Sequence, residues 1–511
     1  YDIHHEYAAR RIAIWFLITV ISTYKKDEIF RVLNAIWVVV GVPVGYFYAK
    51  PYFRVDELET IYALNATIIY FGGFVLINIV TLVFVFISKK EKELSINWIY
   101  AIPFTVFLAA ICILSNKRAW PVYMAAMTAL LIIRLFIWGD GAKWHKILCN
   151  GIIINFICMM VFSLLHRPYY GYIYHRYNMA YMTVTMTATH LTMCMAAISV
   201  KLYAKYKEKN NKTELLPYLF LFGLIADYSI MTMSRTAFLA IFGVIFIAIF
   251  FSVVEKGKSR EKYYDFCARI LILIVSTIII FPVTFTFTRI LPALNDEPVI
   301  YDYEPAIVTI YKGTAPNYEY YMDLPRFIEC FGSKVFGIGD ATARVDDVLY
   351  PDIRNGYYDS DIMLVSAADA IEEINQIENS NKISNGRFDI YLSYLEQSNL
   401  WGHEKMGAIL KDGTEATHAH NIYLQVIYDH GWVFGIYFIF FMMFTWLYSS
   451  ILAVKKEKHN PYILMVPVLL TGFLTAGLVE WIFHPCNPFG LAVILGLAPL
   501  VLKVWVNEEN N

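Results

Sequence analysis

Stretches of about 20 apolar residues, enough for a helix to cross a bilayer, recur along almost the whole chain between polar connections. The pattern predicts about twelve membrane-spanning helices, near residues 31–49, 62–87, 98–115, 120–138, 148–165, 178–202, 215–232, 236–254, 268–288, 432–454, 462–481 and 489–505. A shorter apolar run, residues 10–22, is predicted to lie in the membrane interface, with a thirteenth span as the alternative.

The polar connections fall into two kinds that alternate along the chain, one rich in lysine and one poor in it. The lysine-rich segments include residues 89–92, 143–146, 201–212, 256–262 and 455–458. Loops that carry Lys and Arg tend to remain in the cytoplasm, so these segments are predicted to face it. Both chain ends are then cytoplasmic, and the long polar segment 289–430 lies outside.

This topology divides the chain into three regions: residues 1–288 with the interfacial segment and nine spans, the external loop 289–430, and residues 431–511 with three spans.

The composition agrees with a membrane protein, because 58% of the residues are hydrophobic and 17% are charged, whereas a soluble domain carries about 25% charged residues. The mean hydropathy is +0.49. A net charge of −1 gives no sign of a nucleic-acid partner. We therefore expect an all-α, polytopic membrane protein.

The seven cysteines do not form a disulfide framework. Five lie in or beside apolar spans, where cysteine behaves as a small hydrophobic residue: Cys112, Cys149, Cys158, Cys194 and Cys267. Cys330 and Cys486 are predicted to lie on the outer side, where a pairing between them is left open.

The external loop is rich in tyrosine and, in its first half, in carboxylates such as Asp302, Glu304 and Asp323. A plain solvated cap accounts for most of these carboxylates. Aromatic side chains also stack on the C–H faces of sugars while their hydroxyl groups form hydrogen bonds. The loop is consistent with either a solvated cap or a carbohydrate-binding surface.

The segment from His418 to Asn421 stands where the external loop returns to the membrane. A histidine can accept a proton near neutral pH, so His420 is the candidate catalytic base, supported by His418. Asn421 can cap the following helix and so fix the backbone that carries His420. Two other interpretations stay open: an ordinary boundary histidine, or a metal site in which Glu415 joins both histidines.

Three arginines lie on the predicted outer side, where basic residues are otherwise scarce: Arg167, Arg235 and Arg387. An arginine at the membrane edge often extends to the lipid headgroups. A cluster of guanidinium groups can instead bind a pyrophosphate through paired, charge-assisted hydrogen bonds.

Two acidic residues are further candidates. Asp227 lies inside an apolar helix, two turns before Arg235. It is either a functional acid or a partner in a structural hydrogen bond or ion pair. Glu480 and His484 flank the last predicted outer turn, which places them on the same side of the membrane as His420.

Three motifs occur in an order that resembles a known family. They are Ser234-Arg235 at the outer start of a helix, Gly386-Arg387 followed by Trp401-Gly402 and Gly407, and His420-Asn421 followed by Leu424, Asp429 and Gly431. With the twelve-helix plan and the large outer loop, they resemble the bacterial O-antigen ligase and polysaccharide polymerase family, which acts on undecaprenyl-pyrophosphate-linked glycans. The likeness covers nearly the whole chain. It implies a GT-C-like glycosyltransferase in the bacterial inner membrane, with a periplasmic active site.

The resemblance also implies roles for individual residues. His420 assists the acceptor hydroxyl, and Arg235 and Arg387 bind the pyrophosphate, with Arg167 as a further candidate. General chemistry agrees, because a sugar hydroxyl is a weak nucleophile that needs a base, and a leaving pyrophosphate is stabilised by fixed positive charge. We expect an inverting, metal-independent transfer that uses no cofactor.

The expected function is transfer or polymerisation of an oligosaccharide from undecaprenyl pyrophosphate to a glycan or lipid acceptor, among membrane lipids. The long loop and the Lys/Asn/Ile-rich composition slightly favour a polymerase over a lipid A-core O-antigen ligase. The alternatives are a protein O-oligosaccharyltransferase and a transporter or flippase for the same lipid. Transporters usually have paired broken helices at the bilayer midplane, and the sequence shows no such matched pair.

Overall fold

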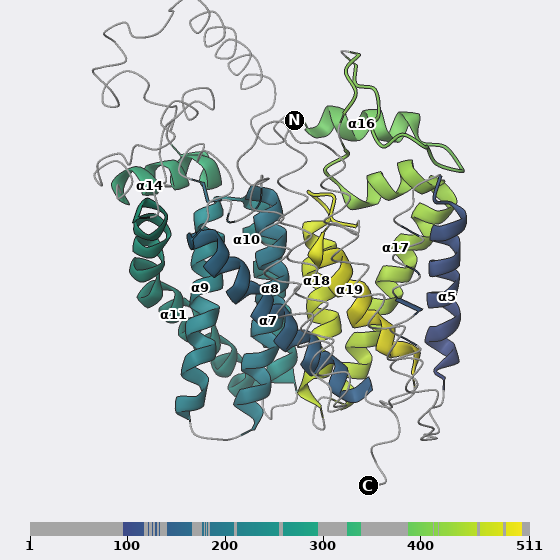
Figure 1. Cartoon of the computed structure of the whole chain (residues 1–511). Helices are drawn as coiled ribbons and strands as arrows, with labels where there is room; N and C mark the ends of the chain where they lie inside the picture. Colours follow the sequence, from purple (N-terminus) through teal and green to yellow (C-terminus); the bar gives the residue numbers. More distant parts are fainter. Residues whose placement is uncertain are drawn as a thin grey trace, which may run out of the picture.

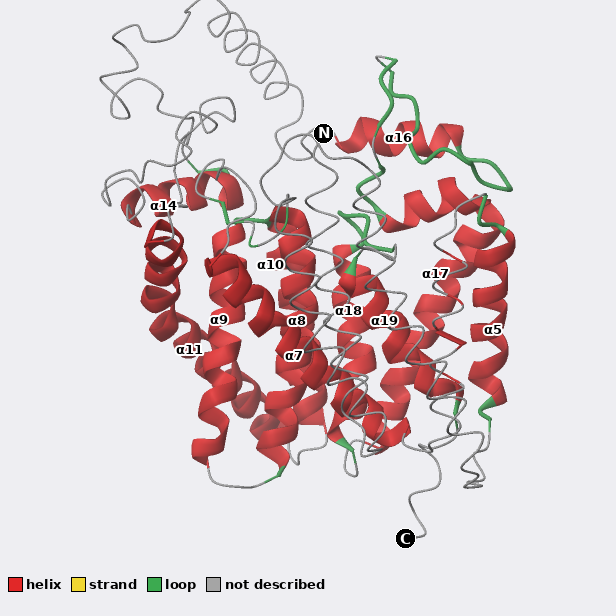
Figure 2. Cartoon of the chain, viewed as in Figure 1, coloured by secondary structure: helices red, strands yellow, loops and turns green. Residues whose placement is uncertain are grey.

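A computed structural model of the chain describes residues 96–116, 141–165, 176–177, 184–208, 212–254, 259–294, 324–338, 387–411, 413–416, 418–456, 460–483 and 487–502, with isolated positions between 121 and 132 and at 179 and 181. Helices make up most of these residues, and no strand occurs among them (Figure 2). The prediction of an all-α fold is confirmed for this part of the chain.

Most of the helices lie where the sequence predicts apolar spans, and two lie in the predicted external loop. They are α5 (Trp98–Ile113), α7 (Gly141–Leu165), α8 (Val184–Lys207), α9 (Leu216–Thr232), α10 (Arg235–Val254), α11 (Ser259–Leu294), α14 (Leu324–Phe331), α16 (Arg387–Gln397), α17 (Ile422–Lys456), α18 (Met465–Ala476) and α19 (Pro488–Leu497). Short helical turns follow α14 (η5, Gly332–Phe336) and precede α18 (η7, Pro461–Leu464). Each span predicted from residue 148 onward overlaps a described helix.

Five described helices are long and apolar enough to cross a membrane: Trp144–Leu165, Thr213–Thr232, Arg235–Val253, Tyr263–Leu291 and Ile422–Lys455. Three shorter helices are also apolar: Trp98–Ile113, Pro461–Ala476 and Pro488–Val501. The predicted spans 31–49 and 62–87 and the interfacial segment 10–22 lie outside the described residues, and 120–138 is described only at isolated positions. The chain has the apolar helices of a membrane protein, and the total of twelve spans stays a prediction.

Helix α8, which is not one of these five, lies in the middle of the bundle. It packs against α7, α9, α10 and α18, and its buried residues include the polar side chains of Thr189, His190 and Thr192. A helix enclosed by other helices has no lipid-facing side, so polar residues are tolerated along it. Helix α11 is the opposite case, because it exposes Ile278 and Ile279, as expected for contact with lipid tails.

The lysine-rich turns of two helices lie at the same end of the bundle. Figure 1 shows the last turns of α8 and α17 at one end, the lower one in this view, and these turns carry Lys205, Lys207, Lys455 and Lys456. The start of α10, at Arg235, lies at the opposite end together with α14 and α16. This arrangement agrees with the predicted alternation of lysine-rich and lysine-poor connections.

Labelling of introduced cysteines tests this sidedness. Thr414→Cys, in an exposed hairpin near α16, should react with a membrane-impermeant maleimide in intact spheroplasts. Lys207→Cys should react only after permeabilisation, because the lysine-rich end is predicted to face the cytoplasm. The native Cys267 is exposed and is first replaced by serine. Labelling of Lys207→Cys in intact spheroplasts would overturn the predicted orientation.

A small cap, residues 387–430, stands at the upper end of the bundle (Figure 1). It consists of α16, the loop 398–419 and the first turns of α17, and its own small core contains Tyr394, Ala408, Ala416, Ala419 and Tyr428. Gln425 joins these parts, because its amide donates to the carbonyl of Met406 (3.0 Å) and its carbonyl accepts from the N–H of Ala419 (2.7 Å). The segment that carries His420 therefore belongs to a packed structure.

Gly431 divides α17 into a short first segment, residues 422–430, and a long second one, residues 432–456. Its backbone has φ 87° and ψ 163°, a conformation open to glycine alone. The N–H of Trp432 donates to the carbonyl of Asn399 (2.9 Å), so the cap loop lies directly against the kink. The predicted boundary between the outer loop and the next span thus falls at this kink.

Gly431→Ala should lower the midpoint of thermal unfolding of the purified protein. The substitution forces a strained backbone, at a cost of roughly 1–3 kcal/mol, and its Cβ would also overlap the carbonyl of Leu400. Gly413→Ala is the matched control, because Gly413 has a similar φ (84°) with nothing within 4 Å of an added Cβ. Equal effects of the two substitutions would show that the close approach at Gly431 is unimportant.

Candidate functional site

His420 lies at the junction between the cap loop and α17, with its backbone in the left-handed region (φ 46°). Its N–H donates to Nδ1 of His418 (3.2 Å), and the centroids of the two imidazole rings are 4.0 Å apart. A non-glycine residue in this conformation costs about 1–3 kcal/mol and persists only where the surrounding contacts hold it. Such residues cluster at functional sites.

Asn421 supplies those contacts. Its Oδ1 accepts from the N–H groups of Tyr423 (2.9 Å) and Leu424 (3.0 Å), so it caps the first segment of α17, as the sequence predicted. Its Nδ2 donates to the carbonyl of Leu478 (2.9 Å), in the turn after α18. Asn421 therefore fixes His420 against both α17 and that turn.

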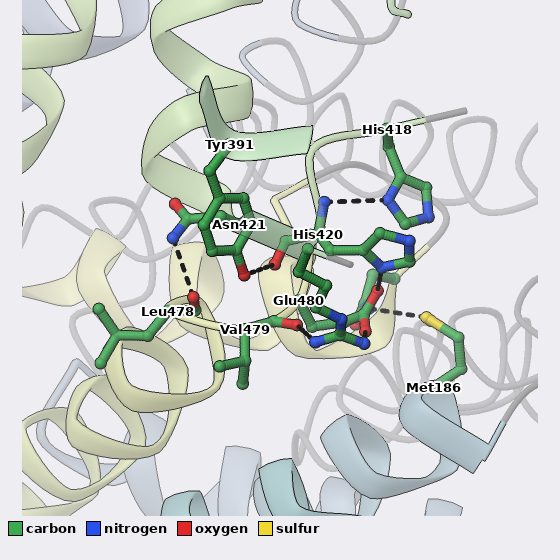
Figure 3. Close-up of polar contacts among 10 residues, drawn as sticks. Met186, Tyr391, His418, His420, Asn421, Leu478, Val479 and Glu480 are labelled. Atoms are coloured by element: carbon green, nitrogen blue, oxygen red, sulfur yellow. Dashed lines mark hydrogen bonds and ion pairs between the residues drawn. The ribbon is translucent and has the colours of Figure 1, made fainter. Parts of the chain in front are cut away.

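Glu480, in the same turn, contacts His420. Its side chain is 3% exposed, and its Oε1 lies 3.4 Å from Nδ1 of His420 (Figure 3). Burial would raise the pKa of Glu480, but the contact with His420 and the charges of His418 and Arg387 outweigh burial and lower the pKa below its usual value. Glu480 is thus a carboxylate at neutral pH, aimed at the imidazole.

Arg387, at the first turn of α16, approaches the same carboxylate from the cap. Its Nη2 lies 4.0 Å from Oε2 of Glu480, and its Nη1 donates to the carbonyl of Val479 (2.6 Å). Tyr391, one turn further along α16, donates its hydroxyl to the carbonyl of His420 (3.3 Å). Three residues that the sequence singled out separately, Arg387, His420 and Glu480, therefore form one contact cluster.

Two more arginines lie at the same end of the bundle. Arg235 begins α10 and donates from Nε to the carbonyl of Lys334 in η5 (3.0 Å). Arg176, in the connection before α8, donates from Nε to the carbonyl of Thr232 (3.1 Å). Burial, together with the charges of Arg387 and Arg235, lowers the pKa of Arg176 to about 10. Arg176 is therefore within electrostatic reach of both other arginines.

Arg176 is the candidate that sequence reasoning missed. The sequence directed attention to Arg167 in the same outer connection, and Arg167 lies outside the described residues. The available signal was a second arginine in that connection, within Tyr174-His175-Arg176-Tyr177, shortly before an apolar span. In the structure Arg176 donates to the carbonyl of Thr232, at the end of α9, and lies within electrostatic reach of Arg235 and Arg387.

The buried Asp227 contributes to helix packing. Its Oδ2 accepts a hydrogen bond from Oγ1 of Thr284 (2.9 Å), which joins α9 to α11. This contact fits the structural alternative, an interhelical hydrogen bond within the membrane. His484 and Cys486 lie outside the described residues, so the position of His484 and the pairing of Cys486 with the buried Cys330 stay predictions.

The same cluster offers ligand atoms for a metal ion. Ligand atoms of His418, His420 and Glu480 all lie within 4.8 Å of one another, and two imidazoles with one carboxylate are a known zinc ligand set. Glu415, which the sequence suggested as the third ligand, is exposed in the hairpin and is not a member of this group. The guanidinium group of Arg387 beside Glu480 opposes a cation there.

The arrangement thus places an imidazole, a buried carboxylate and a group of arginines at one end of an apolar bundle. Helix α10 begins at Arg235, so the positive end of the α10 dipole lies at the same arginine. Such a set of groups can bind a phosphate and activate a hydroxyl. Comparisons of the chain with protein-family models, with curated proteins and with solved structures found no match.

Proposed function

We propose that the protein is an integral-membrane glycosyltransferase that transfers or polymerises an oligosaccharide from undecaprenyl pyrophosphate on the outer face of the bacterial inner membrane. The observation that carries this proposal is the contact of His420 with the buried carboxylate of Glu480, which Arg387 approaches in turn. The cluster stands where the apolar helices meet the polar cap. A donor with a lipid tail and a glycan head would have its pyrophosphate at this boundary.

In the proposed reaction, His420 accepts the proton of the acceptor hydroxyl. Because Nδ1 faces Glu480, that nitrogen carries the hydrogen of the neutral ring, and Nε2 is left as the proton acceptor. The hydroxyl oxygen forms a bond to the anomeric carbon as the bond from that carbon to the phosphate oxygen breaks. Attack from the face opposite to the leaving group inverts the anomeric centre.

The arginines stabilise the leaving group. Undecaprenyl pyrophosphate departs with the electron pair of the broken bond, so negative charge grows on its phosphate oxygens. Arg387 and Arg235 already donate to the main-chain carbonyls of Val479 and Lys334, so their N–H groups can reach oxygen acceptors at this end of the bundle. Charged phosphate oxygens are stronger acceptors of the same kind, and Arg176 adds a third positive charge nearby.

The acceptor decides between the variants of this function. A second carrier-linked repeat would make the protein a polymerase, which the length of the external loop slightly favours, and a lipid A core would make it a ligase. A protein acceptor would make it an O-oligosaccharyltransferase. None of these reactions requires a cofactor, and a metal held by His418, His420 and Glu480 is the competing arrangement. The rival from another class is a transporter or flippase for the same lipid.

The decisive experiment is an assay of the purified protein in detergent with a defined lipid-linked repeat unit. We expect longer glycans on the carrier, or transfer to an added lipid A core, together with free undecaprenyl pyrophosphate. Detergent micelles do not separate two compartments, so any product would exclude pure transport. Absence of product with a lipid-linked repeat, a lipid A core and a serine-rich protein as acceptors would contradict the proposal.

Glu480→Gln should lower kcat about tenfold. Glutamine keeps the size of the side chain but removes the charge that stabilises the protonated imidazole, a contact worth about 1.5 kcal/mol. The effect should appear in kcat more than in the KM for the donor, because the imidazole is charged only as the proton is transferred. Glu415→Gln, at an exposed carboxylate of the cap, is the matched control. An unchanged kcat in Glu480→Gln would remove Glu480 from the mechanism.

A further inference from the structure

A second polar cluster lies at the opposite, lysine-rich end of the bundle. Lys201 on α8 is 7% exposed, and its ammonium group donates to Oδ1 of Asn150 on α7 (2.8 Å). The same Nζ lies 5.4 Å from the ring centroid of Tyr462 and 5.8 Å from that of Tyr218. A lysine ammonium has three N–H donors, and among the described residues the hydrogen bond to Asn150 uses one of them.

Lys146 on α7 adds a second positive charge to this cluster. Its side chain is exposed, and its Nζ lies 5.8 Å from the centroid of the same Tyr462 ring. Glu208, a carboxylate at this end of α8, is bound to Lys205 (2.6 Å). Within the described part of the chain, neither Lys146 nor Lys201 forms an ion pair with a carboxylate.

The surface beside the two lysines is apolar and leads away from them along α7. Asn150 follows Lys146 by one helical turn, and exposed apolar residues continue the same stripe at spacings of three and four: Ile154, Ile157, Val161 and Leu165. Positive charge at the end of an exposed apolar stripe matches a lipid, whose headgroup is polar and whose acyl chains are not. A soluble anion has no acyl chain that would contact this apolar stripe.

We propose that Lys146, Lys201 and Asn150 form a binding site for the phosphate of an anionic phospholipid in the cytoplasmic leaflet. The phosphodiester is an anionic partner of a kind that neither lysine has among the described residues, and its oxygens can accept hydrogen bonds from N–H groups of Lys201 other than the one bound to Asn150. The acyl chains lie along the part of the stripe nearest to the lysines, at Ile154 and Ile157. This site is independent of the transfer reaction at the other end of the bundle.

Native mass spectrometry of the purified full chain tests this site by titration with phosphatidylglycerol and with phosphatidylcholine of the same acyl chains. The wild type should bind phosphatidylglycerol more tightly, and Lys146→Gln should weaken that binding about fivefold without changing phosphatidylcholine binding. Lys201→Gln should act in the same direction. Because Lys201 is buried, the thermal unfolding midpoint of Lys201→Gln is measured as well, to separate a loss of binding from a loss of stability. Lys146 is exposed, so the result for Lys146→Gln decides the test.

Lys205→Gln is the matched control, because Lys205 lies one turn from Lys201 on the same helix and already has Glu208 as its partner. It should bind phosphatidylglycerol as the wild type does. An equal loss in Lys205→Gln, or equal binding of the two lipids by the wild type, would overturn the proposed site. Inorganic phosphate that displaces phosphatidylglycerol at equal concentration would also overturn it, because the ligand would then be a soluble anion.

Discussion

His420→Asn should abolish transfer while the protein still folds. Asparagine tolerates the left-handed backbone that His420 adopts (φ 46°) better than alanine does, so the variant removes the base with little added strain. Loss of a general base lowers turnover by about 10²–10⁴-fold. The measurements are turnover of a lipid-linked repeat, binding of the donor and the thermal unfolding midpoint. Only turnover should change.

His418→Asn is the matched comparison, with both variants assayed with and without a chelator. His418 accepts the N–H of His420 through Nδ1 (3.2 Å) and so positions the base, which predicts a milder loss. Equal losses in the two variants would contradict the general-base role of His420. Loss of wild-type activity in the presence of chelator would also contradict that role. Either result would favour a metal held by His418, His420 and Glu480.

The helices of this protein were predictable because the thickness of a bilayer sets the length of an apolar span. The spans predicted at 215–232 and 236–254 are observed as α9 (Leu216–Thr232) and α10 (Arg235–Val254). The kink in α17 was not predicted, although Gly431 is visible in the sequence. Its conformation depends on the approach of Leu400 from the cap, and hydropathy carries no information on such contacts.

The site shows the same division between local and distant contacts. Asn421 caps α17, as its position directly before an apolar helix predicted. The contact between Glu480 and His420 joins two elements, and sequence spacing placed these residues only on a common side of the membrane. Arg176 was missed because its position depends on how the connection before α8 folds against Thr232. Tertiary packing, which no local pattern encodes, assembles the cluster.

Lysine in place of Arg387, Arg235 or Arg176 should slow turnover roughly ten- to a hundredfold. Lysine keeps the charge but replaces the planar fork of donors by a single ammonium group, which cannot form paired hydrogen bonds to a pyrophosphate. Loss of one charge-assisted hydrogen bond is worth about 1.5–3 kcal/mol. Arg387→Lys should have the largest effect, because Arg387 also lies beside the carboxylate of Glu480 (4.0 Å). The measurement is kcat/KM for the lipid-linked donor.

Arg269→Lys is the matched control for these three variants. Arg269 on α11 donates to Oγ of Ser252 (2.5 Å) and lies over the ring of Tyr206, toward the lysine-rich end of the bundle, so turnover should be unaffected. Normal turnover in all three site variants would mean that their arginines serve lipid headgroups. Arg176→Lys is the most informative of the three, because only folding brings Arg176 near Arg235 and Arg387. A loss of turnover in Arg176→Lys would support a pyrophosphate-binding group of arginines that is assembled by tertiary structure.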